Sequence, residues 1–202
     1  MQDEHSLLTA LLKRKPAGAF EPQELSGKAH WRWNRNQYVE AAVLFDAAWR
    51  VATDKGDRAA FCFRVRSGIC FRLAGHLERA WPILQEAVQF DWDAAGLESD
   101  SHMSDWAFVQ MLAAHHEHRD IESFVAVFSQ AVRRGEQLSA PFTRIHPHQD
   151  SLLSWCADLE LKEEFCHIAE AALYYRGNSQ RLRNNIQQLQ QRLALSVLKS
   201  SD

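Results

Sequence analysis

Glycine and proline are scarce in this 202-residue chain, at eight and five residues. A loop-rich all-β fold needs both at many turns, so their scarcity favours long helices. No apolar run approaches the roughly 18–20 residues that cross a bilayer, so no membrane-spanning helix is expected. Basic residues followed by an apolar stretch are missing near the start, and no signal peptide is expected. The four cysteines form no CxxC pair, which fits reduced thiols in a cytoplasmic protein.

Motifs of common enzymes are also missing, because the chain has no GxSxG elbow, P-loop or GxGxxG. Cys156 lies in an apolar stretch typical of an inert buried thiol. Two histidine groups resemble metal ligands, namely His115 and His118 in "HHEHRD" and His146 and His148 in "IHPHQD". Their spacing does not give HExxH. We therefore expect no catalytic residue, metal or cofactor, with a metal-dependent enzyme using these histidines as an alternative.

The net charge is −3, but basic and acidic residues are concentrated in different bands of the chain. Residues 28–79 hold ten Lys and Arg against five Asp and Glu, whereas residues 80–130 hold one Arg against nine acids. The basic band, with Arg32, Arg35, Arg64, Arg66 and Arg72, has the charge to hold phosphates. The acidic band beside it would repel nucleic acid, so a basic protein is the expected partner. An ordinary solvated surface is the alternative explanation of the acidic band.

Four segments repeat a stripe at offsets of 3, 7 and 10, which is one face of a helix, with apolar or small residues at every position except Glu164. The stripes are Tyr38/Ala41/Phe45/Ala48, Leu77/Ala80/Leu84/Ala87, Ile121/Phe124/Phe128/Ala131 and Leu161/Glu164/Ile168/Ala171. A second helical stretch precedes each one, at about 23–35, 58–74, 104–118 and 149–158. The pattern predicts an all-α chain with four helix–turn–helix units.

The second unit, "RVRSGICFRLAGHLERAWPILQEAV", resembles a tetratricopeptide (TPR) repeat. Gly68 matches the small position where paired helices touch, Phe71 matches the aromatic position, and Gly75 ends the first helix. The other units match only in their second helices, since Arg32 and His115 replace an aromatic and Glu164 replaces an alanine. Over most of residues 23–175, the resemblance implies a TPR-like α-solenoid that binds a partner protein in a concave groove.

The whole chain, 1–202, is expected to form one domain: an N-terminal helix and linker (1–20), the repeats (21–175) and a C-terminal helix (176–202). Residues 4–14 predict a helix with Leu7, Leu8, Leu11 and Leu12 facing inward. The C-terminal stripe of Leu182, Ile186, Leu189 and Leu193 either caps the last repeat or pairs with a second copy. Pro82 predicts that its helix begins late, near Ala80, or bends there.

The stretch "HWRWNRNQY" (30–38) holds two tryptophans that point about 200° apart on a helix. Trp31 is expected in the core, and Trp33 either lines the groove or packs on the N-terminal helix. The repeat register places Asn34, Arg72, His116 and Glu117 in the groove, followed by Cys156 and Ala157. The long connections 91–104 and 134–149 are either functional or plain connectors. The expected partner-binding residues are Trp33, Asn34, Arg72, His116, Glu117, Asp91, Asp93, Glu98 and Asp100.

These features together predict a non-catalytic protein-binding module. The most specific hypothesis is a cognate inhibitor (immunity protein) of a bacterial toxin whose domain is basic, including one that acts on nucleic acid. The acidic band would then steer association and mimic phosphate charge. A secretion or assembly chaperone that binds an extended peptide is the alternative binding role.

Overall fold

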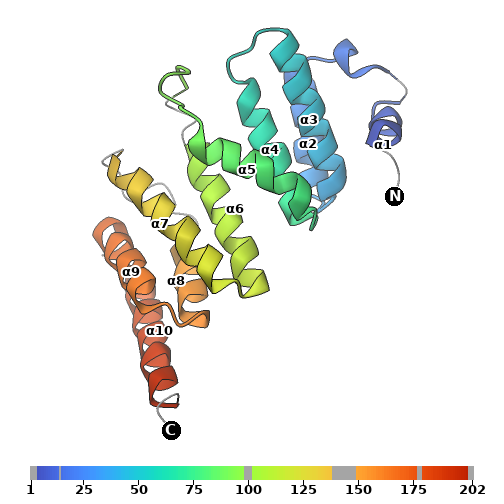
Figure 1. Cartoon of the computed structure of the whole chain (residues 1–202). Coiled ribbons are helices and arrows are strands. Elements are labelled where there is room, and N and C mark those ends of the chain that lie inside the picture. The colour runs from blue at the N-terminus through green and yellow to red at the C-terminus, as the bar shows by residue number, and fades with distance from the viewer. Residues whose placement is uncertain (1–3, 14, 98–101, 138–148, 177–178, 200–202) are drawn as a thin grey trace. The chain divides into compact units, whose positions relative to one another are not determined.

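The computed structural model describes residues 4–13, 15–97, 102–137, 149–176 and 179–199 (Figure 1). Within these ranges the chain forms ten α-helices and one 3-10 helix, with no strand. The prediction of an all-α chain is confirmed. None of the described helices has the length and hydropathy needed to cross a membrane. The helices form two compact units, residues 1–110 and 111–202, whose boundary lies inside α6.

The N-terminal unit holds six helical segments and the first half of a seventh. These are α1 (Glu4–Leu11), η1 (Ala17–Ala19), α2 (Pro22–Trp33), α3 (Tyr38–Asp54), α4 (Ala60–Leu73), α5 (Leu77–Gln89) and the start of α6 (His102–His118). The central helix is α3, which packs against α2 and α4 and also contacts α1 and η1 (Figure 1). On its other side α4 packs against α5.

The C-terminal unit holds the second half of α6 and four further helices. These are α7 (Ile121–Gln137), α8 (Gln149–Asp158), α9 (Lys162–Arg176) and α10 (Gln180–Lys199). Helix α8 packs against α9, and α10 packs against both. The predicted stripe of α10 is buried within the chain. The stripe therefore packs inside the C-terminal unit, as a helix that caps the last repeat requires.

The same turn joins α2 to α3, α4 to α5, α6 to α7 and α8 to α9. One residue in each turn has a positive φ: Asn36 (57°), Gly75 (79°), Arg119 (53°) and Glu160 (61°). Its N–H donates to the carbonyl three residues back, and the next N–H donates to the carbonyl five residues back, with N···O distances of 2.8–3.3 Å. These two bonds satisfy carbonyls that the end of a helix leaves open. The chain thus closes four helix pairs in one way.

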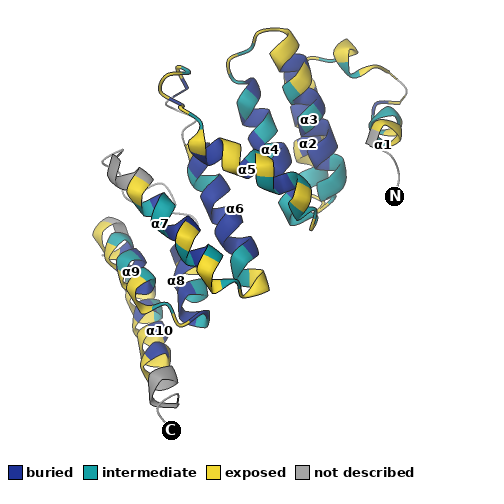
Figure 2. Cartoon of the chain, in the orientation of Figure 1, coloured by how far each residue is buried: buried dark blue, intermediate teal, exposed yellow. Residues whose placement is uncertain are grey.

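Aligning the chain on these turns brings equivalent core positions together. Figure 2 shows the buried parts of the helices in dark blue. The buried sets are Ala41/Ala80/Phe124/Phe165, Phe45/Leu84/Phe128/Ala169 and Ala48/Ala87/Ala131/Ala172. In three units the last three positions of the predicted stripe are buried, but Tyr38 and Leu77 are half-buried and Ile121 is exposed. In the fourth unit the predicted register is wrong by one residue. There Glu164 and Ala171 are only half-buried. Alanine occupies both 171 and 172, but Phe165 beside Glu164 favoured the observed register, because phenylalanine is buried far more often than glutamate.

Two predictions about helix ends were wrong. Helix α1 stops at Leu11, and of the four leucines predicted to face inward only Leu12, just beyond the helix, is buried, while the others keep partial exposure. Helix α5 begins at Leu77 and continues through Pro82, so the predicted late start near Ala80 is wrong, while the alternative of a bend at Pro82 stays a prediction. Proline has no N–H for the carbonyl four residues earlier, which belongs to the exposed residue Glu78. Water can bond that carbonyl, so the helix tolerates the proline.

All four cysteines are free, as the sequence suggested. Cys62 and Cys70 are buried in α4, Cys156 is buried in α8, and Cys166 on α9 is exposed. Burial raises the pKa of the Cys70 thiol, and burial together with Glu164 raises the pKa of Cys156 to about 12. The buried thiols are therefore poor nucleophiles.

Candidate functional site

Trp33 lies in the last turn of α2 and is half-buried. Its ring stacks on Trp106 of α6 with 5.6 Å between centroids, and it meets the edge of Phe45 at 6.0 Å. Neither predicted environment for Trp33 included α6. Asn34, the next residue, is exposed at the end of the helix. Trp33 therefore offers a partner only part of its ring.

The repeated turn places Trp33, Arg72 and His116 at equivalent positions. The carbonyl of each accepts the N–H of the positive-φ residue three positions later. In the fourth pair that carbonyl belongs to Ala157, so the predicted equivalence with Cys156 is wrong by one residue. Arg72 is half-buried in the last turn of α4, and His116 is half-buried in the C-terminal unit.

An acidic turn follows α5, and we define it as residues 91–97. Asp91 accepts the N–H of Ala94 on Oδ1 at 3.0 Å, and the N–H of Leu97 donates to the Trp92 carbonyl at 2.8 Å. The Trp92 side chain is 1% exposed and packs against Phe90 and Phe61.

Asp91 and Asp93 are exposed on either side of this buried anchor. The turn therefore presents two carboxylates on a backbone that a tryptophan holds in place. Glu98 and Asp100, also predicted to bind the partner, lie outside the described residues.

Other carboxylates of the acidic band are engaged within the chain. Glu86 forms an ion pair with Arg64 at 2.8 Å. Asp120 accepts the N–H of Ser123 at 3.1 Å and thereby caps α7. Hydrogen bonds from Ser123 lower the pKa of Asp120. Glu117 is exposed on α6. Glu122 is exposed on α7, so what distinguishes Asp91 and Asp93 is that they lie close together on one turn.

The C-terminal unit holds a polar cluster centred on Asp158, the last residue of α8. The His116 ring stacks on Trp155 at 5.5 Å, and its Nε2 lies 3.3 Å from Asp158 Oδ2. Arg192 of α10 forms an ion pair with the same carboxylate, and Arg119 donates to the Asp158 carbonyl at 3.4 Å. This cluster connects α6, α8 and α10, so its evident role is to hold the unit together.

The predicted histidine groups are only partly described. His115 Nδ1 lies 3.3 Å from Asp120 Oδ2, and burial lowers the pKa of His115. His118 is exposed, and His146 and His148 lie outside the described residues. No group of three potential metal ligands occurs in the part of the chain that the structure describes.

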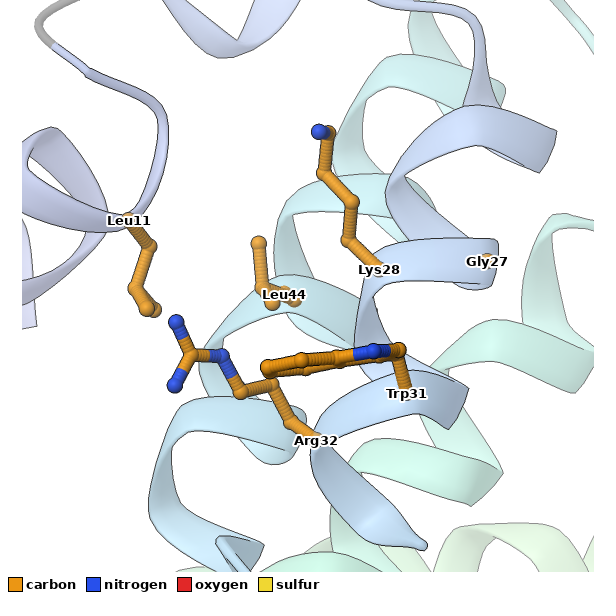
Figure 3. A pocket seen from close by; sticks show the side chains of 6 residues that line it. All are labelled: Leu11, Gly27, Lys28, Trp31, Arg32 and Leu44. Carbon is orange, nitrogen blue, oxygen red and sulfur yellow. The ribbon is translucent and has the colours of Figure 1, made fainter. Parts of the chain in front are cut away.

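Trp31 is 49% exposed, so its predicted place in the core was wrong. The Arg35 guanidinium lies 3.7 Å from the centre of its ring, and that of Arg32 lies 4.9 Å away. A pocket of about 410 Å³ opens beside the ring, between α1, α2 and α3 (Figure 3). Its lining residues are Leu11, Gly27, Lys28, Trp31, Arg32 and Leu44.

Sequence reasoning missed this pocket, although part of its signal was readable. Lys28, Trp31, Arg32 and Arg35 have the i, i+3, i+4, i+7 spacing of one helix face. The contributions of Leu11 and Leu44 come from two other helices and have no local signature. Trp106 and Asp158 were missed for the same reason.

Comparisons of the chain with protein-family models, with curated proteins and with solved structures give no match. Function is therefore inferred from the side chains described above, and the TPR resemblance stays a prediction.

Proposed function

We propose that the chain is a non-catalytic protein-binding module built as a TPR-like solenoid, with α1 and α10 as its terminal helices. The observation that carries the proposal is the set of equivalent buried positions in α3, α5, α7 and α9, aligned on the turns that precede these helices. The turn alone does not carry it, because the same two hydrogen bonds also occur at Gly56 after α3. TPR arrays likewise repeat one helix pair with small and aromatic residues at fixed places. Arrays of this kind commonly present their exposed side chains to partner proteins.

The proposed contact surface in the N-terminal unit is the acidic turn, together with Trp33, Asn34 and Arg72. Support comes from Asp91 and Asp93, which are exposed while Trp92 beneath them is buried. Carboxylates on a fixed backbone lose little conformational freedom when they pair with a basic partner. His116 and Glu117 of the C-terminal unit remain proposed contacts.

The most specific form of the proposal is a cognate inhibitor, or immunity protein, of a bacterial toxin with a basic domain. A nucleic-acid-targeting toxin would present the positive charge that complements Asp91 and Asp93. The four free cysteines support a reducing compartment, and the cytoplasm is proposed.

The test is affinity purification of the partner from the native host, followed by kinetics with Asp93→Lys. The Asp93 side chain is exposed, so the fold should tolerate the charge reversal. We expect association to slow several-fold and to lose part of its salt dependence, with dissociation little changed. The matched control is Glu163→Lys on the exposed face of α9, which should leave both rates unchanged. Equal association rates for Asp93→Lys and the control would contradict the assigned surface.

A further inference from the structure

The pocket beside Trp31 combines positive charge with an exposed aromatic ring. Lys28 and Arg32 line it, and Arg35 covers part of the Trp31 ring from the turn that follows α2. In Figure 3 Lys28 stands on one side of the Trp31 ring and the Arg32 guanidinium reaches toward Leu11. Three cations thus surround one apolar opening.

Within the described part of the chain these cations have no carboxylate partner. Arg32 Nη1 donates to the Gln37 amide oxygen at 2.8 Å, and Arg35 Nη1 donates to the Trp31 carbonyl at 3.2 Å. The Lys28 ammonium lies 5.6 Å from the Phe20 ring centre. These neutral partners orient the side chains but leave their charge uncompensated. The lining of the pocket contains no acidic residue.

The rest of the lining is hydrocarbon. Leu44 of α3 is 2% exposed and closes the pocket between α1 and α2, and Leu11 faces it from α1. A volume of about 410 Å³ lies at the small end of the range of about 300–1,000 Å³ typical of ligand pockets. It suits one large side chain with its adjoining backbone better than an extended polymer.

We propose that this pocket binds an acidic segment of a partner protein. One aliphatic or aromatic side chain of that segment packs on Trp31 and Leu44, and its flanking Asp or Glu carboxylates pair with Lys28, Arg32 and Arg35. Arg groups favour carboxylates because the planar guanidinium donates two parallel hydrogen bonds.

Nucleic acid fits the pocket less well. The leucine walls have no donors or acceptors for a base edge, whereas they suit an apolar side chain.

This inference goes beyond the proposed function. The ligand proposed for the pocket is acidic, whereas the partner proposed for the acidic turn is basic. The two surfaces lie on the same unit but use different residues. Loss of one binding activity with retention of the other is therefore measurable.

The direct test uses short fluorescein-labelled peptides and fluorescence anisotropy with the full chain. The probe is a Glu- and Asp-rich peptide with one central leucine. One comparison peptide replaces the leucine with asparagine, and another replaces every acid with its amide. We expect each comparison peptide to bind about tenfold more weakly than the probe, since both the apolar insertion and the charge contribute. A single-stranded oligonucleotide of similar length serves as the fourth ligand.

Two variants test the site itself, Trp31→Ala and Lys28→Glu. Both side chains are exposed, so circular dichroism should show an unchanged helix content. We expect each variant to weaken binding of the probe about tenfold. The matched controls are Ile121→Ala, an apolar side chain 47% exposed on α7, and Lys162→Glu, an exposed lysine on α9. Both controls should bind the probe as the original chain does.

Three outcomes would overturn the proposal. The first is equal binding of the probe by the original chain and both pocket variants. The second is tighter binding of the oligonucleotide than of the probe, with the same dependence on Trp31. The third is self-association of the chain that Lys28→Glu abolishes, which would assign the pocket to a second copy.

Discussion

Gly68 of α4 lies directly against Ile83 of α5. A Cβ atom added at Gly68 would lie 2.8 Å from Ile83 Cγ2 and 3.0 Å from Ile83 Cβ. Non-bonded carbon atoms pack at about 3.5–4.0 Å, so contacts this short would force the neighbouring atoms to move. The absence of a side chain at Gly68 therefore sets how closely the second helix pair packs.

Gly68→Leu is expected to lower the free energy of unfolding by about 1–3 kcal/mol, because the added side chain overpacks this contact. Gly27→Leu on α2 is the matched control, since nothing lies within 4 Å of a Cβ at that position. The control should be neutral or stabilise by up to about 1 kcal/mol, because leucine favours helix more than glycine does. Urea denaturation measures both. Similar values for the two variants would show that the helix contact is looser than described.

Trp31 and Trp33 should respond differently to the same substitution. Trp33→Ala removes the stacking with Trp106 and the edge contact with Phe45, and it should cost about 1–3 kcal/mol for a half-buried aromatic. Trp31→Ala removes a solvent-facing ring and its cation–π contact with Arg35, and it should cost about 0.5–1 kcal/mol. Thermal unfolding compares the variants. A larger loss for Trp31→Ala would reverse the assignment of the two rings.

The positive-φ residues of the repeated turn predict a pair of opposite effects. Gly75→Ala places a Cβ at φ 79° and should cost about 1 kcal/mol. Glu160→Gly at the equivalent place relieves strain at φ 61° and should stabilise by up to about 1 kcal/mol, partly offset by a more flexible unfolded chain. Denaturant midpoints test both. Destabilisation by Glu160→Gly would mean that its side chain contributes more than the turn geometry.

His115 should make stability depend on pH. Burial lowers its pKa below the usual 6.5, so the unfolded chain takes up the proton first. The free energy of unfolding is therefore unaffected by this group above pH 6.5, and it decreases as the pH falls from 6.5 toward the folded-state pKa. His115→Gln should flatten that part of the stability curve, as measured by denaturation at a series of pH values.

The charge of Asp120 opposes this effect, because it raises the pKa of His115. Asp120→Asn removes the charge but keeps a residue that caps helices well. We expect the pKa of His115 to fall further in this variant, as followed by NMR titration of the ring. An increase would show that Asp120 affects His115 in some way other than its charge.

Much of the fold was predictable because it depends on local pattern. The 3.6-residue spacing located the helix pairs, and Gly75 marked a turn that needs a positive φ. The fourth unit was misplaced by one residue because Leu161 and Ile168 fitted the predicted stripe, although Phe165 beside Glu164 favoured the other register. The start of α5 was missed because Pro82, in the second turn, leaves open only the carbonyl of the exposed residue Glu78, which the helix tolerates.

The candidate sites were less predictable because they depend on contacts between distant residues. The sequence showed that Trp31 and Trp33 point in different directions. Which of the two rings is covered depends on Trp106, which lies on another helix. The Trp31 pocket likewise needs Leu11 and Leu44, and Asp158 needs Arg192 of α10. The sequence around Trp31 and around Asp158 gives no sign of these distant contacts.

Three of the four thiols are hidden from reagents while the helices stay formed. Cys70 on α4 and Cys156 on α8 lie one in each unit, and both have raised pKa values. Each will react with an alkylating reagent when its own helix opens to solvent. Cys166 is exposed and will be modified first. Mass spectrometry that follows the alkylation of Cys70 and Cys156 would then measure the opening rate of each unit separately. No substitution in the chain is needed.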